Sequence, residues 1–438
     1  MPVSTRPSSR RRATDVGVRL AVAAGRLAGF ASRLVGRGGT AVPGLVAERI
    51  DRRLIEHLVA GLPEGVVVVT GTNGKTTTTR MLVAILEHAG KRVLTNPTGS
   101  NLARGVATAL IGASRRARVD ADLAVFEVDE AAVRALGARL RPRLVVVTNL
   151  ARDQLDRYGE LDTTAAHVAA AISEAGGAVL NADDPMVAAL AGPGPVMRFG
   201  AVAAIRATMP DDRSLYAGGA VRASGDPDAL LVSSVAHGDG QEAVVRVGGD
   251  DLILHLAVPG AYNGYNAAAA LLAASRLGVA PRSAVPALEA MPPAFGRGQV
   301  VPYRGRRVKL LLVKNPAGFN QTIRLLGDVE TGASVLVAIN DEHADGRDVS
   351  WLWDARVEDL AATRHRFGAG GVRSADMALR FKYAGVEAWN EPDFARALNR
   401  AVEEAAEGET VYVVPTYTAM LRFLELLLPG VKRSDAWS

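Results

Sequence analysis

The sequence predicts an α/β fold with two units, each built on a mainly parallel sheet. From about Val66 onward, the 438-residue chain alternates short apolar strands with longer helical stretches. The same alternation begins again near Val308, after a stretch rich in proline and glycine. Such alternation is typical of parallel sheets that are covered by helices on both faces.

The segment before the first strand, residues 1–52, is expected to form a basic tail and a helix. Residues 1–15 contain four arginines against one aspartate, which favours a disordered tail. Residues 16–35 carry apolar residues at helical spacing with arginines between them. We expect this helix to pack against the first α/β unit, and contact with an anionic membrane surface is the alternative.

The first unit is predicted to span residues 53–298. Its strands are expected at residues 66–70, 92–95, 123–128, 144–149 and 177–181. Polar residues lie at or next to the carboxyl ends of four of them, namely Thr70, Glu127, Asn149 and Asn181. Ligands of parallel sheets bind at the carboxyl ends of strands, so these residues mark the expected site. Residues 197–251 break the rhythm with short β-like pieces and predict a small β insertion.

The most specific motif is a β-branched strand that runs into a glycine-rich turn and then opens a helix. The turn ends in Gly74-Lys75-Thr76, and a strict G-x-x-x-x-G-K-[ST] pattern fails because Val69 stands at the first glycine position. Backbone N–H groups and the helix dipole favour phosphate here, with Lys75 reaching the β/γ-phosphates and Thr76 binding magnesium. The predicted ATP loop consists of Gly71, Thr72, Asn73, Gly74, Lys75, Thr76 and Thr77.

A carboxylate at a neighbouring strand end would complete a magnesium site. Glu127 is the candidate, and a solvated acidic turn is the alternative. Asp129 and Glu130 are interpreted as charges at the start of a helix. Asn149 and Asp153 follow the next buried strand and could position phosphate, metal or water.

The second unit is predicted to span residues 299–438. Residues 281–299, which include the stretch Phe295-Gly296-Arg297-Gly298, are interpreted as an interdomain linker. Strands are expected at residues 308–313, 334–339, 385–389 and 410–415.

Composition narrows the class of protein. The chain is 48% hydrophobic and 22% charged, and no apolar run reaches the length needed to cross a bilayer. We therefore expect a cytoplasmic protein. A peripheral position at the inner face of the membrane is compatible with this expectation. A net charge of +5 predicts no nucleic-acid-binding face. The sequence has no cysteine, so it contains no disulfide, thiolate zinc site or catalytic thiol.

Two motifs resemble the Mur ligase superfamily, whose members join amino acids or ammonia to carboxylates through acyl phosphates. One is the ATP loop, and the other begins at Gly260 and follows the pattern G-x-x-N-x-x-N-x-x-A-A. The resemblance implies a central P-loop ATPase domain with a parallel sheet, a C-terminal Rossmann-like α/β domain, and ATP and Mg²⁺ as cofactors. It further implies that Asn266 contacts the adenine side of ATP, Asn263 caps its helix, and Arg297 reaches ATP when the domains close.

Residues 313–321 and 340–354 resemble the MurT family in particular. MurT is the synthetase subunit of a complex that amidates the α-carboxyl of D-glutamate in lipid II stem peptides, giving D-isoglutamine for peptidoglycan. The resemblance implies a heterodimer with a GatD-type glutaminase, lipid II as substrate at the membrane surface, and Asp348 as the aspartate of a Cys-His-Asp triad shared across the interface. Asp354 is the alternative triad residue. A purely structural alternative is that Asp345 and Asp348 form an Asp-Gly turn and a helix cap.

The chain departs from the family at three places. Many MurT proteins carry a four-cysteine zinc ribbon where residues 198–234 stand here, so we expect no zinc and apolar packing instead, around Leu215, Tyr216, Leu230 and Leu231. Gln154 stands where Mur ligases often have a histidine. Lys314 stands where stand-alone Mur ligases usually have an aspartate before the Asn-Pro pair. Lys314 and Asn315 are expected to face the acyl phosphate, and a buried structural role is the alternative for Asn315.

Two other functions fit parts of the sequence. One is a stand-alone Mur-type or folylpolyglutamate-type ligase that adds an amino acid, which would depend on free amino acid. The other is a non-catalytic ATP-binding scaffold for cell-wall assembly, which would turn over no ATP. Trp351 and Trp353 would suit a protein interface if they face solvent, with core packing as the alternative.

Overall fold

The structure is a computed structural model that describes residues 9–34, 41–97, 100–115, 117–151, 161–209, 226–237, 239–293, 296–329 and 331–430. The α-helices are α1 (Ser9–Leu34), α2 (Val42–Ile50), α3 (Leu54–Val59), α4 (Lys75–His88), α5 (Ala103–Ala113), α6 (Glu130–Leu140), α8 (Leu161–Ser173), α9 (Pro185–Ala188), α10 (Ala203–Arg206), α11 (Ala261–Arg276), α12 (Pro281–Glu289), α13 (Pro316–Gly327), α14 (Ser374–Tyr383), α15 (Phe394–Glu404) and α16 (Tyr417–Leu427). Two 3₁₀ helices are η1 (Ser350–Asp354) and η2 (Val357–Leu360).

The strands are β1 (Val66–Thr70), β2 (Val93–Thr95), β3 (Ser114–Arg115), β4 (Arg118–Val119), β5 (Leu123–Glu127), β6 (Leu144–Val147), β7 (Ala178–Asn181), β8 (Val196–Ala201), β9 (Ala229–His237), β10 (Gly240–Val247), β11 (Asp250–Leu256), β12 (Arg297–Tyr303), β13 (Arg306–Leu311), β14 (Ser334–Ala338), β15 (Arg366–Gly370), β16 (Ala388–Glu391) and β17 (Thr410–Pro415). Within the described residues they form a nine-stranded sheet, a six-stranded sheet and the small β3–β4 pair.

The larger sheet belongs to the central part of the chain and has the order β11-β10-β9-β8-β7-β6-β1-β5-β2. Pairing is parallel from β2 to β9, and β10 pairs antiparallel with β9 on one side and with β11 on the other. Side chains of β1 alternate between two cores: Val67 and Val69 pack with α4, α11 and α12, while Val66 and Val68 pack with α3, α5, α6 and α8. The predicted parallel sheet with helices on both faces is confirmed.

The segment expected to be an inserted β element is part of this sheet. β8 pairs in parallel with β7, and β9–β11 extend the same edge as long antiparallel strands. Alternating burial along β11 explains the weak sequence signal, since only every second residue faces the core. Of the residues expected to stabilise the segment, Leu231 is buried and Leu230 is half-buried, whereas Leu215 and Tyr216 lie outside the described residues.

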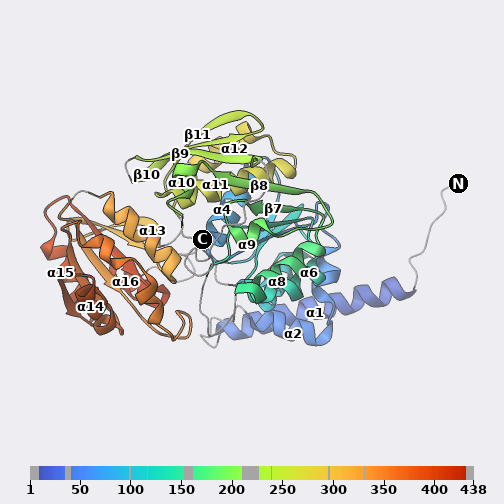
Figure 1. The fold of residues 1–438 in the computed structure, drawn as a ribbon. Coiled ribbons are helices and arrows are strands. Elements are labelled where there is room, and N and C mark those ends of the chain that lie inside the picture. Colours follow the sequence, from blue (N-terminus) through green and yellow to red (C-terminus); the bar gives the residue numbers. More distant parts are fainter. Residues whose placement is uncertain are drawn as a thin grey trace.

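The C-terminal part forms a second layered unit, which lies beside the first in Figure 1. Its sheet has the order β12-β13-β17-β14-β15-β16, with α13, α14, η1 and η2 on one face and α15 and α16 on the other. Residues 297–299 were expected in a linker but begin β12, which pairs antiparallel with β13 at the edge of this sheet. Gly298 stands where an apolar side chain would have indicated a strand, so the sequence pattern did not predict the start of β12.

The N-terminal helix α1 packs on α2 and α5 and extends beyond the body of the domain (Figure 1). Gly25 and Gly29 allow the close approach, because a Cβ atom at either position would lie 3.0 Å from an atom of Pro43 in α2. Arg26 of α1 donates hydrogen bonds to the carbonyl oxygens of Ile111 and Ser114 at the end of α5. None of the helices in the described part of the chain is both long and apolar enough to span a bilayer.

Candidate nucleotide-binding site

The glycine-rich loop lies at the carboxyl end of β1, where the order of the central sheet reverses. β5 pairs with one side of β1 and β6 with the other. In parallel sheets this switch point is where ligands bind. The loop continues into α4, a 14-residue helix whose N-cap residue, Gly74, has no side chain to cap it. The first N–H groups of a helix point toward its N-terminus, which here is the loop.

Left-handed glycines shape the loop. Gly71 has φ 122°, and a Cβ atom there would lie 2.3 Å from Thr148 Oγ1. Gly74 has φ 85°, and a Cβ atom there would lie 2.3 Å from Asn266 Oδ1. Both positions therefore need glycine for conformation and for space.

Asn149, two residues after the end of β6, holds the loop backbone in place. Its Oδ1 accepts a hydrogen bond from the Asn73 N–H at 2.9 Å, and its Nδ2 donates to the Asn73 carbonyl oxygen at 2.9 Å. The Thr148 hydroxyl donates to the same carbonyl oxygen at 2.7 Å. The described contacts of Asn149 are with the loop itself, so it preorganises the cradle that was predicted from sequence.

Asn266 also contacts the loop. It is buried in α11, where its Oδ1 accepts a hydrogen bond from the Thr78 hydroxyl at 3.2 Å, and it lies against Gly74. The expected cap by Asn263 is wrong: Gly260 is the N-cap of α11, and Asn263 Nδ2 donates to the Pro259 carbonyl oxygen at 2.7 Å. Asn263 lies one turn inside the helix, where its side chain reaches back to that carbonyl and accepts from Asn266.

Lys75 is buried and forms an ion pair that the sequence did not reveal. Its Nζ lies 2.7 Å from Glu130 Oε2 and 2.5 Å from the Gly71 carbonyl oxygen, and the two residues are 7% and 5% exposed. Burial alone would lower the pKa of Lys75, but Glu130 and Asp129 outweigh it and raise the pKa. Burial would raise the pKa of Glu130, but the charges of Lys75 and Lys314 outweigh it and lower the pKa.

Glu130 is therefore more than a charge at a helix start. Asp129 does have that role, because it is the N-cap of α6 and accepts the Ala131 N–H at 3.1 Å. Glu130 is the next residue, and its carboxylate turns inward to the loop lysine. The ion pair joins residues that are 55 positions apart in the sequence. The only local sign of it is that a second carboxylate directly follows Asp129.

The oxygens predicted to bind magnesium lie at the same edge of the sheet. Glu127 ends β5 in register with Val69, next to the start of the loop, and Thr76 is in the first turn of α4; both are buried. Asn96 fixes the Glu127 backbone, accepting its N–H and donating to its carbonyl oxygen, each at 2.9 Å. Thr70 Oγ1, directly before the loop, is buried without a hydrogen-bond partner among the described residues. Carboxylate, hydroxyl and uncapped N–H groups suit Mg²⁺ with a nucleotide phosphate.

The second unit faces the loop through Asn315. This residue is buried, caps α13 by accepting the Gly318 N–H at 2.8 Å, and donates through Nδ2 to Asn73 Oδ1 at 3.1 Å. The structural role foreseen for Asn315 thus exists together with a contact to the phosphate loop. Lys314 is half-buried, close enough for its charge to act on Glu130.

The described contacts of the loop include none of the remaining predicted residues. Only the backbone of Arg297 is described, at the start of β12, and Asp153 and Gln154 lie outside the described residues. Asp348 is exposed on the second unit, where its Oδ1 accepts the Ser350 N–H at 2.8 Å at the start of η1. Hydrogen bonds from Ser350 lower the pKa of Asp348. Asp345, by contrast, is buried and accepts the Thr418 N–H at 2.8 Å, and Asp354 is exposed.

The arrangement of a phosphate loop at the switch point of one sheet, faced by a second α/β unit, is that of the Mur-type ligases. A pseudomurein peptide ligase type C from Methanothermus fervidus is similar with a TM-score of 0.66 at 18% identity, over 85% of this chain and 79% of that one. MurF from Thermotoga maritima in complex with ADP is similar with a TM-score of 0.67 at 16% identity, over 87% and 83%. The Mur ligase middle domain family matches residues 69–274.

Sequence relatives narrow the class. The MurT ligase C-terminal family matches residues 312–420. The MurT subunit of lipid II isoglutaminyl synthase (glutamine-hydrolysing) from Streptococcus pneumoniae is 33% identical over 93% of this chain and 96% of its own length. The corresponding Staphylococcus aureus subunit is 30% identical over 92% and 96%. This chain belongs to the MurT family of the Mur ligase superfamily, and it is a carbon–nitrogen ligase.

Proposed function

We propose that this chain is the synthetase subunit of an enzyme that amidates the α-carboxyl of D-glutamate in the lipid II stem peptide, with ammonia from a GatD-type glutaminase. The observation that carries the proposal is the glycine-rich loop, whose backbone Asn149 holds in place for a phosphate. It occurs in a chain whose relatives are named as a subunit of a glutamine-hydrolysing synthase. A subunit that lacks cysteine and belongs to a glutamine-hydrolysing enzyme needs a partner to release ammonia.

In the proposed reaction the carboxylate oxygen attacks the γ-phosphorus of ATP, and ADP leaves. Ammonia then attacks the acyl carbon, phosphate leaves, and a proton is lost to give the amide. Mg²⁺ would neutralise charge on the transferred phosphoryl group. Thr76 and Glu127 would hold that ion, and the loop N–H groups would bind the β-phosphate side. Lys75 would exchange Glu130 for phosphate oxygens, with Lys314 adding positive charge from the second domain.

Asp348 is the residue we assign to the glutaminase histidine. The 3₁₀ helix η1, which follows Asp348, is anchored by the buried Arg380 of α14, which donates to the carbonyl oxygens of Leu352 at 3.0 Å and Ala355 at 2.6 Å. The hydrogen bond from Ser350 lowers the pKa of Asp348 and orients its carboxylate, which suits an aspartate that orients a histidine.

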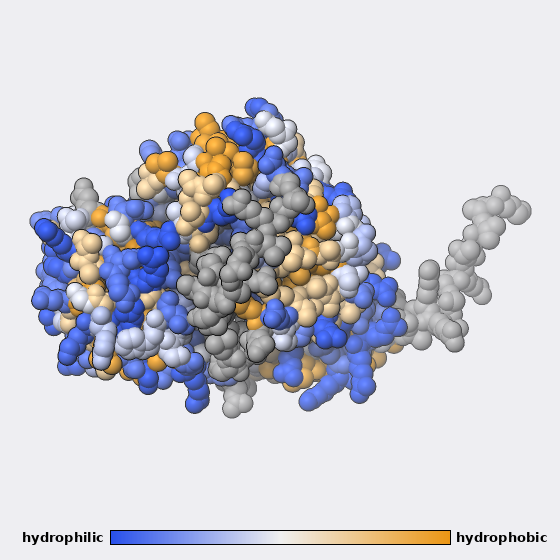
Figure 2. Space-filling model, viewed as in Figure 1, coloured by the Kyte–Doolittle hydropathy of each residue, from blue (hydrophilic) through white to orange (hydrophobic). Residues whose placement is uncertain are grey.

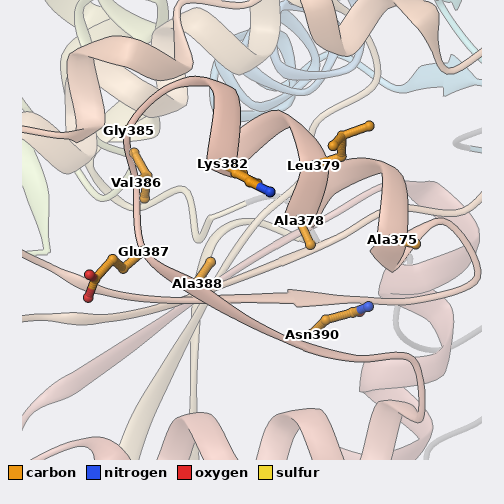
Figure 3. A pocket seen from close by; sticks show the side chains of 9 residues that line it. All are labelled: Ala375, Ala378, Leu379, Lys382, Gly385, Val386, Glu387, Ala388 and Asn390. Atoms are coloured by element: carbon orange, nitrogen blue, oxygen red, sulfur yellow. The ribbon is translucent and has the colours of Figure 1, made fainter.

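An apolar surface next to this segment suits a partner subunit. Trp353 and Tyr383 are 50% and 71% exposed, and their rings meet edge to face with centroids 5.5 Å apart. On the same helix, Leu379 and Lys382 line a hollow of about 680 Å³ between α14 and β16. Figure 3 shows Lys382 and Asn390 on opposite sides of this hollow. Exposed aromatic side chains beside a pocket are typical of interface anchors.

The test is amidation of lipid II by this chain co-expressed with a GatD-type glutaminase, followed by mass spectrometry. We expect amidation with glutamine and with ammonium chloride. Asp348→Asn should reduce the glutamine reaction by about a hundredfold or more while sparing the ammonia reaction. Asp354→Asn changes the exposed residue named above as the alternative triad aspartate and should leave both reactions unchanged. Equal loss with both nitrogen sources would contradict the role of Asp348, and no amidation with either source would contradict the proposed function.

A further inference from the structure

Helix α1 carries two apolar faces on opposite sides. Val18, Ala21, Val22 and Gly25 are buried against the domain. Val16, Leu20, Leu27 and Phe30 are 56%, 59%, 70% and 58% exposed. At 3.6 residues per turn the second set, with exposed Ala23 between, falls on one stripe opposite the buried face. The buried face accounts for the attachment of α1 to the domain, so this attachment does not explain the exposed apolar stripe.

The charge around this stripe has one sign. Residues 1–47 contain eight arginines and one aspartate, a net charge of +7, whereas the whole chain carries +5. Arg19 is exposed one position from Leu20. In the space-filling view, hydrophilic side chains dominate the lower right edge, where α1 and α2 lie, and hydrophobic patches interrupt them (Figure 2). An apolar stripe flanked by arginine is the pattern of helices that lie in the plane of an anionic membrane surface.

We propose that the exposed stripe of α1 docks this enzyme on an anionic lipid surface, with Leu20, Leu27 and Phe30 entering the headgroup region. A second copy of the chain is disfavoured as the occupant, because pairing two stripes would bring two segments of +7 together. Anionic lipid removes this repulsion and attracts the arginines. The inference rests in part on the proposed function, since a lipid-linked acceptor would keep the enzyme at a membrane.

The geometry of α1 agrees with this role. The helix is 26 residues long, and its N-terminal part projects beyond the domain (Figure 1). Its attachment to α2 and α5 through Gly25, Gly29 and Arg26 leaves the opposite face outward along the helix. Docking would therefore fix the orientation of the central domain to the surface without any change in the nucleotide site.

The experiment is co-sedimentation of the full chain, with its glutaminase, on vesicles of phosphatidylcholine with or without phosphatidylglycerol. We expect binding only to the anionic vesicles, weakened by salt. Leu27→Asn with Phe30→Asn should reduce the partition coefficient by about tenfold or more, because two large apolar side chains no longer enter the interface. Val235→Asn with Ile253→Asn, two exposed residues of β9 and β11, is the matched control and should bind like the wild type.

Several results would overturn the proposal. Binding to neutral vesicles as strong as to anionic ones, or undiminished binding by the α1 variant, would do so. A concentration-dependent dimer in light scattering that the α1 variant abolishes, without vesicle binding, would assign the stripe to a second copy. Arg19→Gln keeps the apolar stripe and should weaken only the anionic binding, which gives a second test should the double variant unfold. Amidation of detergent-solubilised lipid II separates the two proposals: its absence in the wild type would contradict the proposed function, and its retention without vesicle binding would contradict only this inference.

Discussion

Lys75 and Glu130 form a buried ion pair, and Lys75 is the residue that we propose binds phosphate. In that proposal, nucleotide must compete with Glu130 for the ammonium group and must also approach the like charge of the Glu130 carboxylate. We expect Glu130→Gln to lower the free energy of unfolding without nucleotide by about 3 kcal/mol, because a buried charge loses its partner. The same variant should show a larger rise in melting temperature on adding Mg-ATP than the wild type does. Differential scanning fluorimetry with and without Mg-ATP measures both, and a smaller rise would show that Glu130 instead helps to hold the nucleotide.

The pair should also give the unliganded protein a defined pH dependence. The pKa of Glu130 is lowered from 4.5, so its stabilisation is present above pH 4.5 and is lost as the pH falls through the lowered pKa. The pKa of Lys75 is raised from 10.5, so its stabilisation is present below pH 10.5 and is lost as the pH rises further. The stability difference between wild type and Glu130→Gln should therefore be largest between these limits and should shrink in acid. A difference that stays constant down to pH 3 would contradict this assignment.

Local motifs could be predicted at the residue scale, and distant partners could not. The loop from Gly71 to Thr77 and the strand-end residue Glu127 follow from neighbouring residues and from the edge rule for parallel sheets. The partner of Lys75 depends on how the first residues of α4 and α6 come together at the carboxyl edge of the sheet, which no local pattern encodes. The support that Asn149 gives to Asn73 is likewise a product of the β1–β6 pairing.

At the scale of elements, α4 offers two left-handed glycines for comparison. Gly74 precedes the helix with φ 85° and touches Asn266, whereas Gly90 follows it with φ 81° and open space around it. Gly90→Ala should cost about 1–2 kcal/mol of stability from backbone strain alone and leave nucleotide binding unchanged. Gly74→Ala should add a clash with Asn266 and abolish binding of Mg-ATP in calorimetry. Equal nucleotide affinity in the two variants would show that the loop adapts to a side chain at position 74.

Strands that form unbroken apolar runs could be predicted, whereas strands with glycine or with alternating exposed residues could not. β1, β5 and β6 are buried on both faces and read as unbroken apolar runs. β15 was missed because Gly368 stands where an apolar residue was expected. A Cβ atom there would lie 2.2 Å from the Trp389 ring, so glycine provides the space in which that ring packs.

At the scale of the whole molecule, Asp239 in the β9–β10 turn joins the central unit to the second one. Asp239 forms an ion pair with Arg307, and its carbonyl oxygen accepts a hydrogen bond from Lys309 Nζ at 2.9 Å. Burial lowers the pKa of Lys309 despite the nearby Asp239. Gln321 of α13 adds a hydrogen bond to the Thr208 carbonyl oxygen at 3.1 Å. These contacts and the Asn315–Asn73 pair hold the second unit against the phosphate loop.

Removing the Asp239 charge should favour opening of the two units rather than unfolding. Asp239 is half exposed, so Asp239→Asn should cost at most about 1 kcal/mol, which would still raise the open fraction about fivefold. Small-angle X-ray scattering should show a larger radius of gyration without nucleotide, and high salt should produce the same change in the wild type. Asp251→Asn breaks an equally exposed pair with Arg246 inside the β10–β11 hairpin and should leave the radius unchanged. If both variants expand alike, general charge loss and not the Asp239 contact sets the distance between the units.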